Sequence, residues 1–196
     1  MTRALAALPL LLACACGPRA ATGRFHPREE GLTLLYEDPR LPEPRRHEER
    51  LQARVMATKE EGGSLLIRVS YQTLSNRLEV LQCARRGGLA LPDGRGGGLV
   101  LLPEGFPAVP AWEVRGTRHA VIGWGTREFP VGLLPRDHPR VGVWVESTAP
   151  SGQRRRAFLL PDLGEVEAFQ FEGGAWVCVN RLVSRGFTDL PSRSRS

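Results

Sequence analysis

Apolar and polar side chains alternate along several short stretches of the chain, and this alternation predicts β-strands. The clearest pair of stretches, residues 51–58 and 65–72, flanks a turn at residues 61–63 that contains two adjacent glycines. Because every second side chain in each stretch is apolar, one face of each strand can lie against a core. Together they predict an antiparallel hairpin. The first stretch follows Glu48 and Glu49 and is also compatible with a helix.

The same pattern recurs over most of the chain. Runs at residues 166–171 and 175–179 around the turn at 172–174 predict a second hairpin. Turn-forming residues separate the runs at short intervals, and no convincing long helical pattern interrupts them. The sequence therefore predicts an antiparallel all-β domain, folded as a β-sandwich or a partly open barrel. Further strands are predicted at residues 32–36, 78–83, 99–102, 120–124 and 141–145, and from residue 154 onward.

One part of this pattern resembles a known family. Val69 and Tyr71 alternate with polar residues, Ser75 and Asn76 form a turn, and a second alternating run follows at residues 78–83. This arrangement resembles the central hairpin of immunoglobulin-like β-sandwich domains in bacterial envelope proteins. The resemblance covers about thirty residues and implies the sandwich alternative.

The first residues resemble an export signal. Arg3 supplies a short basic region, and residues 4–13 are apolar, which is too short for the roughly twenty residues that cross a membrane. The sequence Leu-Leu-Ala-Cys-Ala-Cys-Gly at residues 11–17 resembles the lipobox of bacterial lipoproteins. In that family a cysteine receives diacylglycerol, the signal is cut before it, and the acyl chains anchor the protein. The resemblance implies lipidation of Cys16, with Cys14 as the alternative.

The anchor suggests a division of the chain. We expect a lipoprotein signal peptide over residues 1–15, a flexible tether over 16–30, a single β-rich domain over 31–191 and a disordered tail over 192–196. Hydrophobic content of 41% and charged content of 24% are typical of a globular domain. The resemblance implies a cell-envelope protein, lipid-anchored to a membrane and facing the periplasm or the exterior.

Two cysteines remain in the expected domain. Cleavage before Cys16 leaves Cys83 and Cys178 in a compartment that permits disulfides, and we expect them to pair. In the chain-entropy model, such a bond would contribute about 4 to 5 kcal/mol. Two buried free thiols are the alternative. No C-x-x-C pair supports a zinc site.

The formal net charge is +6, and arginines are scattered along the chain. An exported protein meets lipid headgroups, envelope polysaccharide and acidic proteins more often than nucleic acid. We therefore expect three kinds of partner: the membrane through the N-terminal lipid, an envelope protein, or an anionic polysaccharide; we expect no nucleic acid. The run of Arg154, Arg155 and Arg156 either contacts such anions or protects an exposed sheet edge, and we favour the edge.

The sequence predicts no catalytic, cofactor or metal site. Residues 94–98 lack the ending of a phosphate-binding loop, no G-x-S-x-G motif is present, and Asp137 and His138 are typical of a turn before a proline. The tryptophans could line a sugar-binding face, although core packing is the expected role for most of them.

We therefore expect a binding or assembly module without chemistry of its own. The alternative is an envelope hydrolase whose acid and base, Glu113 or Glu146 with His119, meet only in the fold. Convergence of His119 with acids in a deep pocket would favour the enzyme, and a filled core with a flat surface patch would favour the binder.

Overall fold

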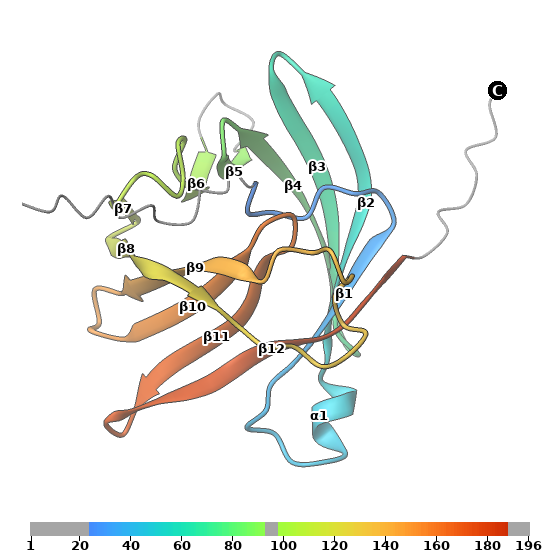
Figure 1. The fold of residues 1–196 in the computed structure, drawn as a ribbon, viewed down its shortest axis with the longest axis vertical. Helices are drawn as coiled ribbons and strands as arrows, with labels where there is room; N and C mark the ends of the chain where they lie inside the picture. Colours follow the sequence, from blue (N-terminus) through green and yellow to red (C-terminus); the bar gives the residue numbers. More distant parts are fainter. Residues whose placement is uncertain (1–23, 93–97, 188–196) are drawn as a thin grey trace, which may run out of the picture.

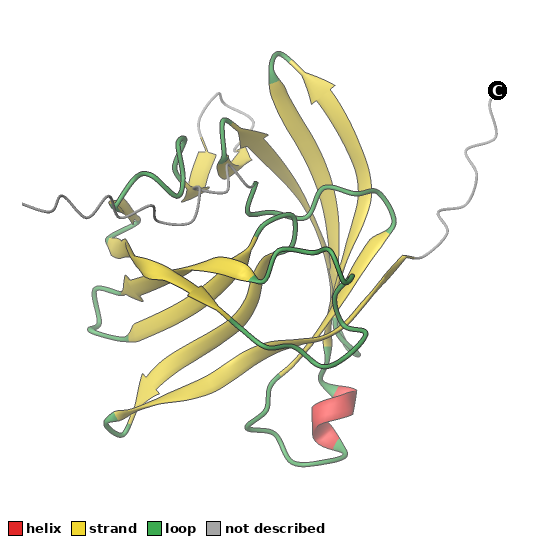
Figure 2. Ribbon diagram, in the orientation of Figure 1, coloured by secondary structure: helices red, strands yellow, loops and turns green. Residues whose placement is uncertain are grey.

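The computed structural model describes residues 24–92 and 98–187, and in them one antiparallel sheet curls into a nearly closed barrel (Figures 1 and 2). A short helix, α1 (Arg45–Glu48), lies between the first two strands. The twelve strands are β1 (Leu32–Glu37), β2 (Leu51–Glu61), β3 (Ser64–Gln72), β4 (Arg77–Arg85), β5 (Gly88–Pro92), β6 (Gly98–Leu102), β7 (Ala111–Val114), β8 (Thr117–Thr126), β9 (Val141–Thr148), β10 (Arg154–Leu160), β11 (Gly164–Glu172) and β12 (Ala175–Phe187).

Nearly every strand pairs with its neighbours in the chain. The order is β6-β5-β4-β3-β2-β1-β12-β11-β10-β9-β8-β7, so that the first and last strands of the domain lie side by side and β6 and β7 form the two edges. This confirms the antiparallel all-β prediction and its partly open barrel form. The described residues contain one sheet rather than two packed sheets, so the immunoglobulin-like sandwich is not supported.

The two predicted hairpins are both present. β2 pairs with β3, and Gly62 and Gly63 turn the chain between them with φ values of 57° and 74°. Glycine adopts this left-handed conformation without steric cost. The stretch that was compatible with a helix is therefore a strand. β11 pairs with β12 around the turn at Gly173 and Gly174 in the same way.

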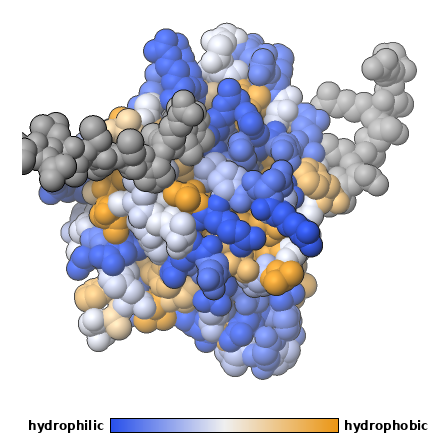
Figure 3. Space-filling view, in the orientation of Figure 1, coloured by the Kyte–Doolittle hydropathy of each residue, from blue (hydrophilic) through white to orange (hydrophobic). Residues whose placement is uncertain are grey.

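Strand alternation places the core inside the barrel. In β1, Leu32, Leu34 and Tyr36 are buried while the residues between them are partly exposed. Figure 3 shows hydrophilic side chains over most of the viewed surface, with apolar side chains in separate patches. Within the described residues, the structure has no helix with the length and apolar character needed to cross a membrane.

The N-terminal segment packs into the barrel. Phe25 and His26 are each 1% exposed. The ring of Phe25 makes T-shaped contacts with the rings of Phe106 and Trp124, at centroid distances of 5.3 and 6.3 Å. The tether predicted over residues 16–30 is therefore wrong at its C-terminal end, because these side chains belong to the folded core. Both expected lipidation positions, the signal peptide over 1–15 and the tail over 192–196 lie outside the described residues.

The structure does not support the predicted disulfide. Cys83 in β4 and Cys178 in β12 are free thiols. Their strands are separated by β3, β2 and β1, which makes four strand-to-strand steps. At about 4.8 Å a step the strands lie roughly 19 Å apart along the sheet, whereas the Cα atoms of a disulfide lie within about 7 Å of each other.

The arginine run occupies an interior strand of the sheet. β10 is hydrogen-bonded to β9 on one side and to β11 on the other. The prediction that these arginines protect an exposed edge is therefore wrong. Each of them instead forms an ion pair with a carboxylate of a neighbouring strand.

Candidate functional site

A cavity of about 400 Å³ lies inside the barrel. Every one of the twelve strands contributes a residue to its lining, and the N-terminal segment contributes Phe25, His26 and Pro27. Its volume is in the range of small-molecule binding sites. The barrel is thus partly hollow rather than completely filled by its core.

A connected polar cluster covers the wall formed by four adjacent strands. The guanidinium of Arg155 in β10 donates to Glu165 Oε1 in β11 at 2.5 Å. The amide of Asn180 in β12 donates to the same oxygen at 3.2 Å. The hydroxyl of Tyr36 in β1 donates to the backbone carbonyl of Glu165 at 3.0 Å. Burial raises the pKa of Tyr36, so its phenol stays protonated.

Three other lining side chains bear buried polar atoms without partners among the described residues. They are His26, through both ring nitrogens, Gln82, through Oε1, and Trp112, through Nε1. The amide nitrogen of Gln82 does have a partner, because it donates to the hydroxyl of Tyr71 at 3.1 Å. A buried polar atom without a partner costs about 1 to 3 kcal/mol, so such atoms are normally matched by water or a ligand.

His119 and Ser147 form a separate pair on the cavity wall. The Nδ1 of His119 lies 2.8 Å from Ser147 Oγ, because the register of β8 and β9 places the two residues opposite each other. The His119 ring stacks on Trp112 at a centroid distance of 5.0 Å. Burial, together with the nearby charge of Arg155, lowers the pKa of His119 and favours a neutral imidazole.

Neither expected catalytic acid meets His119. Glu146 immediately precedes Ser147 in β9 and therefore points to the opposite face of the sheet. There it binds Arg154 and Arg156, each at 2.7 Å. Glu113 is exposed in β7 and pairs in register with Arg118 of β8. The acid and base of the hydrolase alternative are thus not brought together.

The other histidines lie apart from one another. His47 in α1 contacts Glu43 at 2.8 Å, and His138 lies in the turn region that its sequence predicted. The described parts of the chain contain no group of three or more His, Cys, Asp or Glu residues arranged to hold a metal ion. Residues 94–97 of the glycine-rich loop lie outside the described residues.

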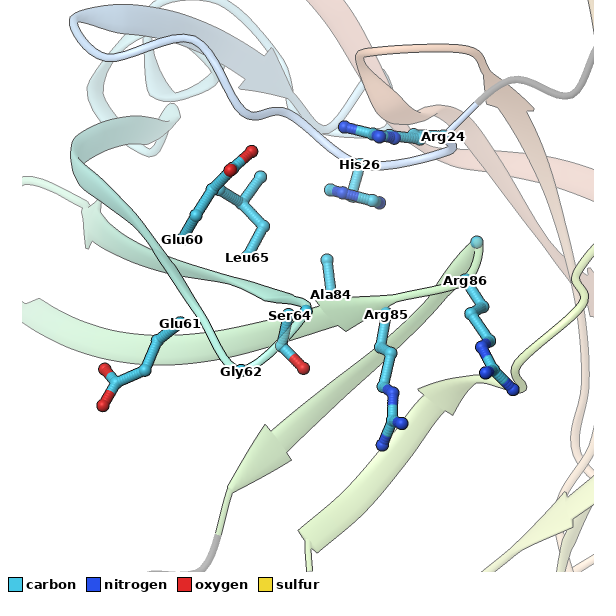
Figure 4. A pocket seen from close by; sticks show the side chains of 12 residues that line it. Arg24, His26, Glu60, Glu61, Gly62, Ser64, Leu65, Ala84, Arg85 and Arg86 are labelled. Carbon is cyan, nitrogen blue, oxygen red and sulfur yellow. The ribbon is translucent and has the colours of Figure 1, made fainter.

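His26 also borders a second hollow of about 350 Å³ at one end of the barrel. Figure 4 shows its imidazole and the side chain of Arg24 on the N-terminal segment, across from Arg85 and Arg86. Since His26 lines both this hollow and the interior cavity, the N-terminal segment lies between the two spaces. Burial and the charges of Arg24 and Arg28 lower the pKa of His26 to about 4.

The tryptophans divide between two places. Trp112 lines the interior cavity, whereas Trp124, Trp144 and Trp176 line a separate hollow of about 320 Å³ over β8–β12. Trp124 contacts the core residue Phe25, but 40% of its surface stays exposed, so it is only partly a core residue. The guanidinium of Arg156 lies 4.2 Å from the ring centroid of Trp176, within the range of cation–π contacts.

Sequence reasoning identified His119 but missed most residues of the interior cavity. A signal was present for two of them. Gln82 is in phase with Ala84 on β4, and Ser147 is in phase with Val143 and Val145 on β9, so both polar residues occupy inward positions. A polar residue in the apolar phase of a strand indicates a buried polar contact.

Two solved structures are similar to this fold. One is a protein from Bacteroides fragilis that has a YmcC-like fold and is classed as exported; it is 14% identical, with a TM-score of 0.53 over 84% of this chain and 99% of its own. The other, from Parabacteroides distasonis, is classed as a lipoprotein; it is 12% identical, with a TM-score of 0.49 over the same shares. No family model and no curated protein matches the chain.

Proposed function

We propose that the protein is a lipid-anchored binding module of the bacterial cell envelope that holds a small molecule inside its barrel and performs no chemistry on it. The observation that carries this proposal is the interior cavity, into whose lining His26, Gln82 and Trp112 bring buried polar atoms without partners. A ligand that supplies those partners pairs with hydrogen-bonding groups that the protein itself leaves unmatched. It also releases water from the apolar part of the lining.

The N-terminus supports the envelope location. Residues 11–17 resemble a lipobox, and a protein that shares the fold is classed as exported. Lipidation at Cys16 places the anchor nine residues before Phe25, which is buried in the barrel. Nine residues span at most about 32 Å, so the barrel would stay close to the membrane surface.

The face with the hollow that Trp124, Trp144 and Trp176 line favours an anionic partner, such as a polysaccharide or an acidic envelope protein. Four arginines there share only two carboxylates, which leaves an excess of positive charge for an acidic group to neutralise. The carboxylates belong to Glu146 and Glu167, and the arginines are Arg127, Arg154, Arg156 and Arg181.

The His119–Ser147 pair is the observation that favours the alternative function, an envelope hydrolase. A serine nucleophile needs a base within hydrogen-bond distance, and this pair meets that requirement. It also needs a group that orients the imidazole, and neither Glu113 nor Glu146 does so. We therefore assign the pair to ligand binding. A hydrolase would lose its activity in a Ser147→Ala variant that keeps its fold and its ligand.

Intact-mass measurement of protein purified from bacterial membranes tests the anchor. The expected mature chain begins at Cys16 and carries the mass of its acyl chains, and Cys16→Ser abolishes this modification. A chain that begins at Cys14 would support the alternative site. Protein found in the cytosol with its leader uncut would contradict the proposed anchor and location.

A second measurement tests the binding function. Protein purified from native envelopes is denatured, and the small molecules it releases are identified by mass spectrometry. Ala157→Phe, which places a phenyl ring inside the cavity, should abolish their release. Val131→Phe is the matched control, because Val131 is fully exposed. Equal release from both variants, or none from the wild-type protein, would refute binding inside the barrel.

A further inference from the structure

The lining of the interior cavity combines apolar and polar side chains on the same walls. β5 and β6 contribute Leu89, Leu101 and Leu102. Gln82 in β4 and Trp112 in β7, which bear polar atoms without partners, lie on the strands to either side of these two. Of the strands that carry the connected polar cluster, β10 and β1 also contribute apolar residues. A ligand that matches this lining presents apolar surface together with hydrogen-bonding groups and is therefore amphipathic.

The charges on the cavity lining balance. Arg155 and Glu165 form an ion pair at 2.5 Å, so their charges compensate each other. Burial keeps the pKa of His26 at about 4, and burial with the nearby Arg155 also lowers the pKa of His119, so both imidazoles are neutral near pH 7. A ligand with a net charge would lose hydration without meeting an opposite charge.

The polar atoms without partners indicate which hydrogen-bonding groups the polar end of the ligand carries. Gln82 Oε1 requires a hydrogen-bond donor, and Trp112 Nε1 requires an acceptor. A neutral imidazole at His26 presents one of each. Hydroxyl and amide groups both donate and accept, whereas an ether or ketone only accepts and an ammonium only donates.

From these features we infer that the cavity binds an uncharged amphiphile, an apolar chain or ring that bears a hydroxyl-rich or amide head. This inference rests on the proposed binding function and names its class of ligand. The cavity of about 400 Å³ is within the size range of small-molecule binding sites, which is enough for a short alkyl chain with such a head.

Three probes with eight-carbon chains test the inference. Octyl glucoside has an uncharged hydroxyl-rich head, octanoate is anionic and octylamine is cationic. Each is added below its micelle-forming concentration to the full lipidated protein in phospholipid nanodiscs. The readout is the fluorine NMR signal of 5-fluorotryptophan at Trp112, assigned with Trp112→Phe, so that probe dissolved in lipid is not counted as binding.

We expect octyl glucoside to shift the Trp112 signal saturably, and the charged probes to bind at least tenfold more weakly. Gln82→Leu should weaken glucoside binding about five- to tenfold, because it removes an acceptor but keeps the side-chain size. Gln72→Leu makes the same change at an exposed position of the neighbouring β3 and should leave binding unchanged. If Gln82→Leu fails to fold, Ala157→Phe replaces it and should abolish the shift.

Tighter or equal binding of octanoate or octylamine would overturn the inference. So would an unchanged Trp112 signal with all three probes, since the cavity would then hold water or another class of molecule. The release of bound molecules from native protein is a separate measurement, so the class of ligand can fail while the binding function stands.

Discussion

Replacing Phe25 with alanine tests whether the N-terminal segment is part of the folded domain. Phe25 is 1% exposed and packs edge to face against Phe106 at 5.3 Å. Truncating a fully buried phenylalanine costs about 3 to 5 kcal/mol, through lost burial and the cavity left behind. Because domains are stable by only about 5 to 15 kcal/mol, this loss is a large share of the total.

Urea denaturation followed by tryptophan fluorescence measures the effect. Phe25→Leu should reduce the free energy of unfolding by about 1 to 2 kcal/mol and gives a second point on the same scale. Phe187→Ala, at a position 58% exposed, should cost less than about 1 kcal/mol. If Phe25→Ala unfolds at the same urea concentration as Phe187→Ala, the N-terminal segment contributes no core packing. The prediction of a flexible tether over residues 16–30 would then be correct.

Three further outcomes are expected. Burial raises the pKa of Glu146, but hydrogen bonds from two arginines of β10 outweigh it and hold that pKa below its usual value. Its ionised form therefore stabilises the fold above about pH 4, by about 1 kcal/mol because the arginines are partly exposed. Urea titrations should show that Glu146→Gln has a lower free energy of unfolding than the wild type, and that this difference shrinks at lower pH. Gly142→Ala should lower the thermal midpoint by the equivalent of about 1 to 3 kcal/mol, because the new Cβ would lie 2.3 Å from the Leu159 carbonyl oxygen; an unchanged midpoint would show that β9 and β10 are not packed this closely. When the protein is denatured without reduction and then alkylated, mass mapping should find both Cys83 and Cys178 modified as free thiols. In the native state Cys178 should be alkylated slowly, because burial raises the pKa of its thiol. Protection of both cysteines from alkylation after denaturation would indicate a disulfide.

The local pattern of apolar and polar residues was sufficient to predict most of the strands. The β2–β3 and β11–β12 hairpins follow from alternation around paired glycines, since both signals act within about twenty residues. β5 and β7 have only five and four residues, too few to establish a period, whereas β6, which is equally short, was predicted from its unbroken apolar run. The packing of Phe25 was missed because it lies in an irregular segment without periodicity, where burial depends on distant partners.

The interior site required information that the sequence pattern does not hold. His119 and Ser147 are 28 residues apart, and Arg155 lies close to His119 only through the order and register of β8, β9 and β10. A shift of one residue in register would turn these side chains to the opposite face. The expected Cys83–Cys178 bond failed for the same reason, since sequence separation says nothing about how many strands lie between two residues.

The most direct test of the account is a high-resolution crystal structure of protein purified from its native envelope. We expect continuous density for a bound molecule inside the barrel, with polar atoms within about 3.2 Å of Gln82 Oε1 and Trp112 Nε1. A cavity that holds only ordered water, or that is closed by its own side chains, would contradict the claim that the barrel interior is a binding site.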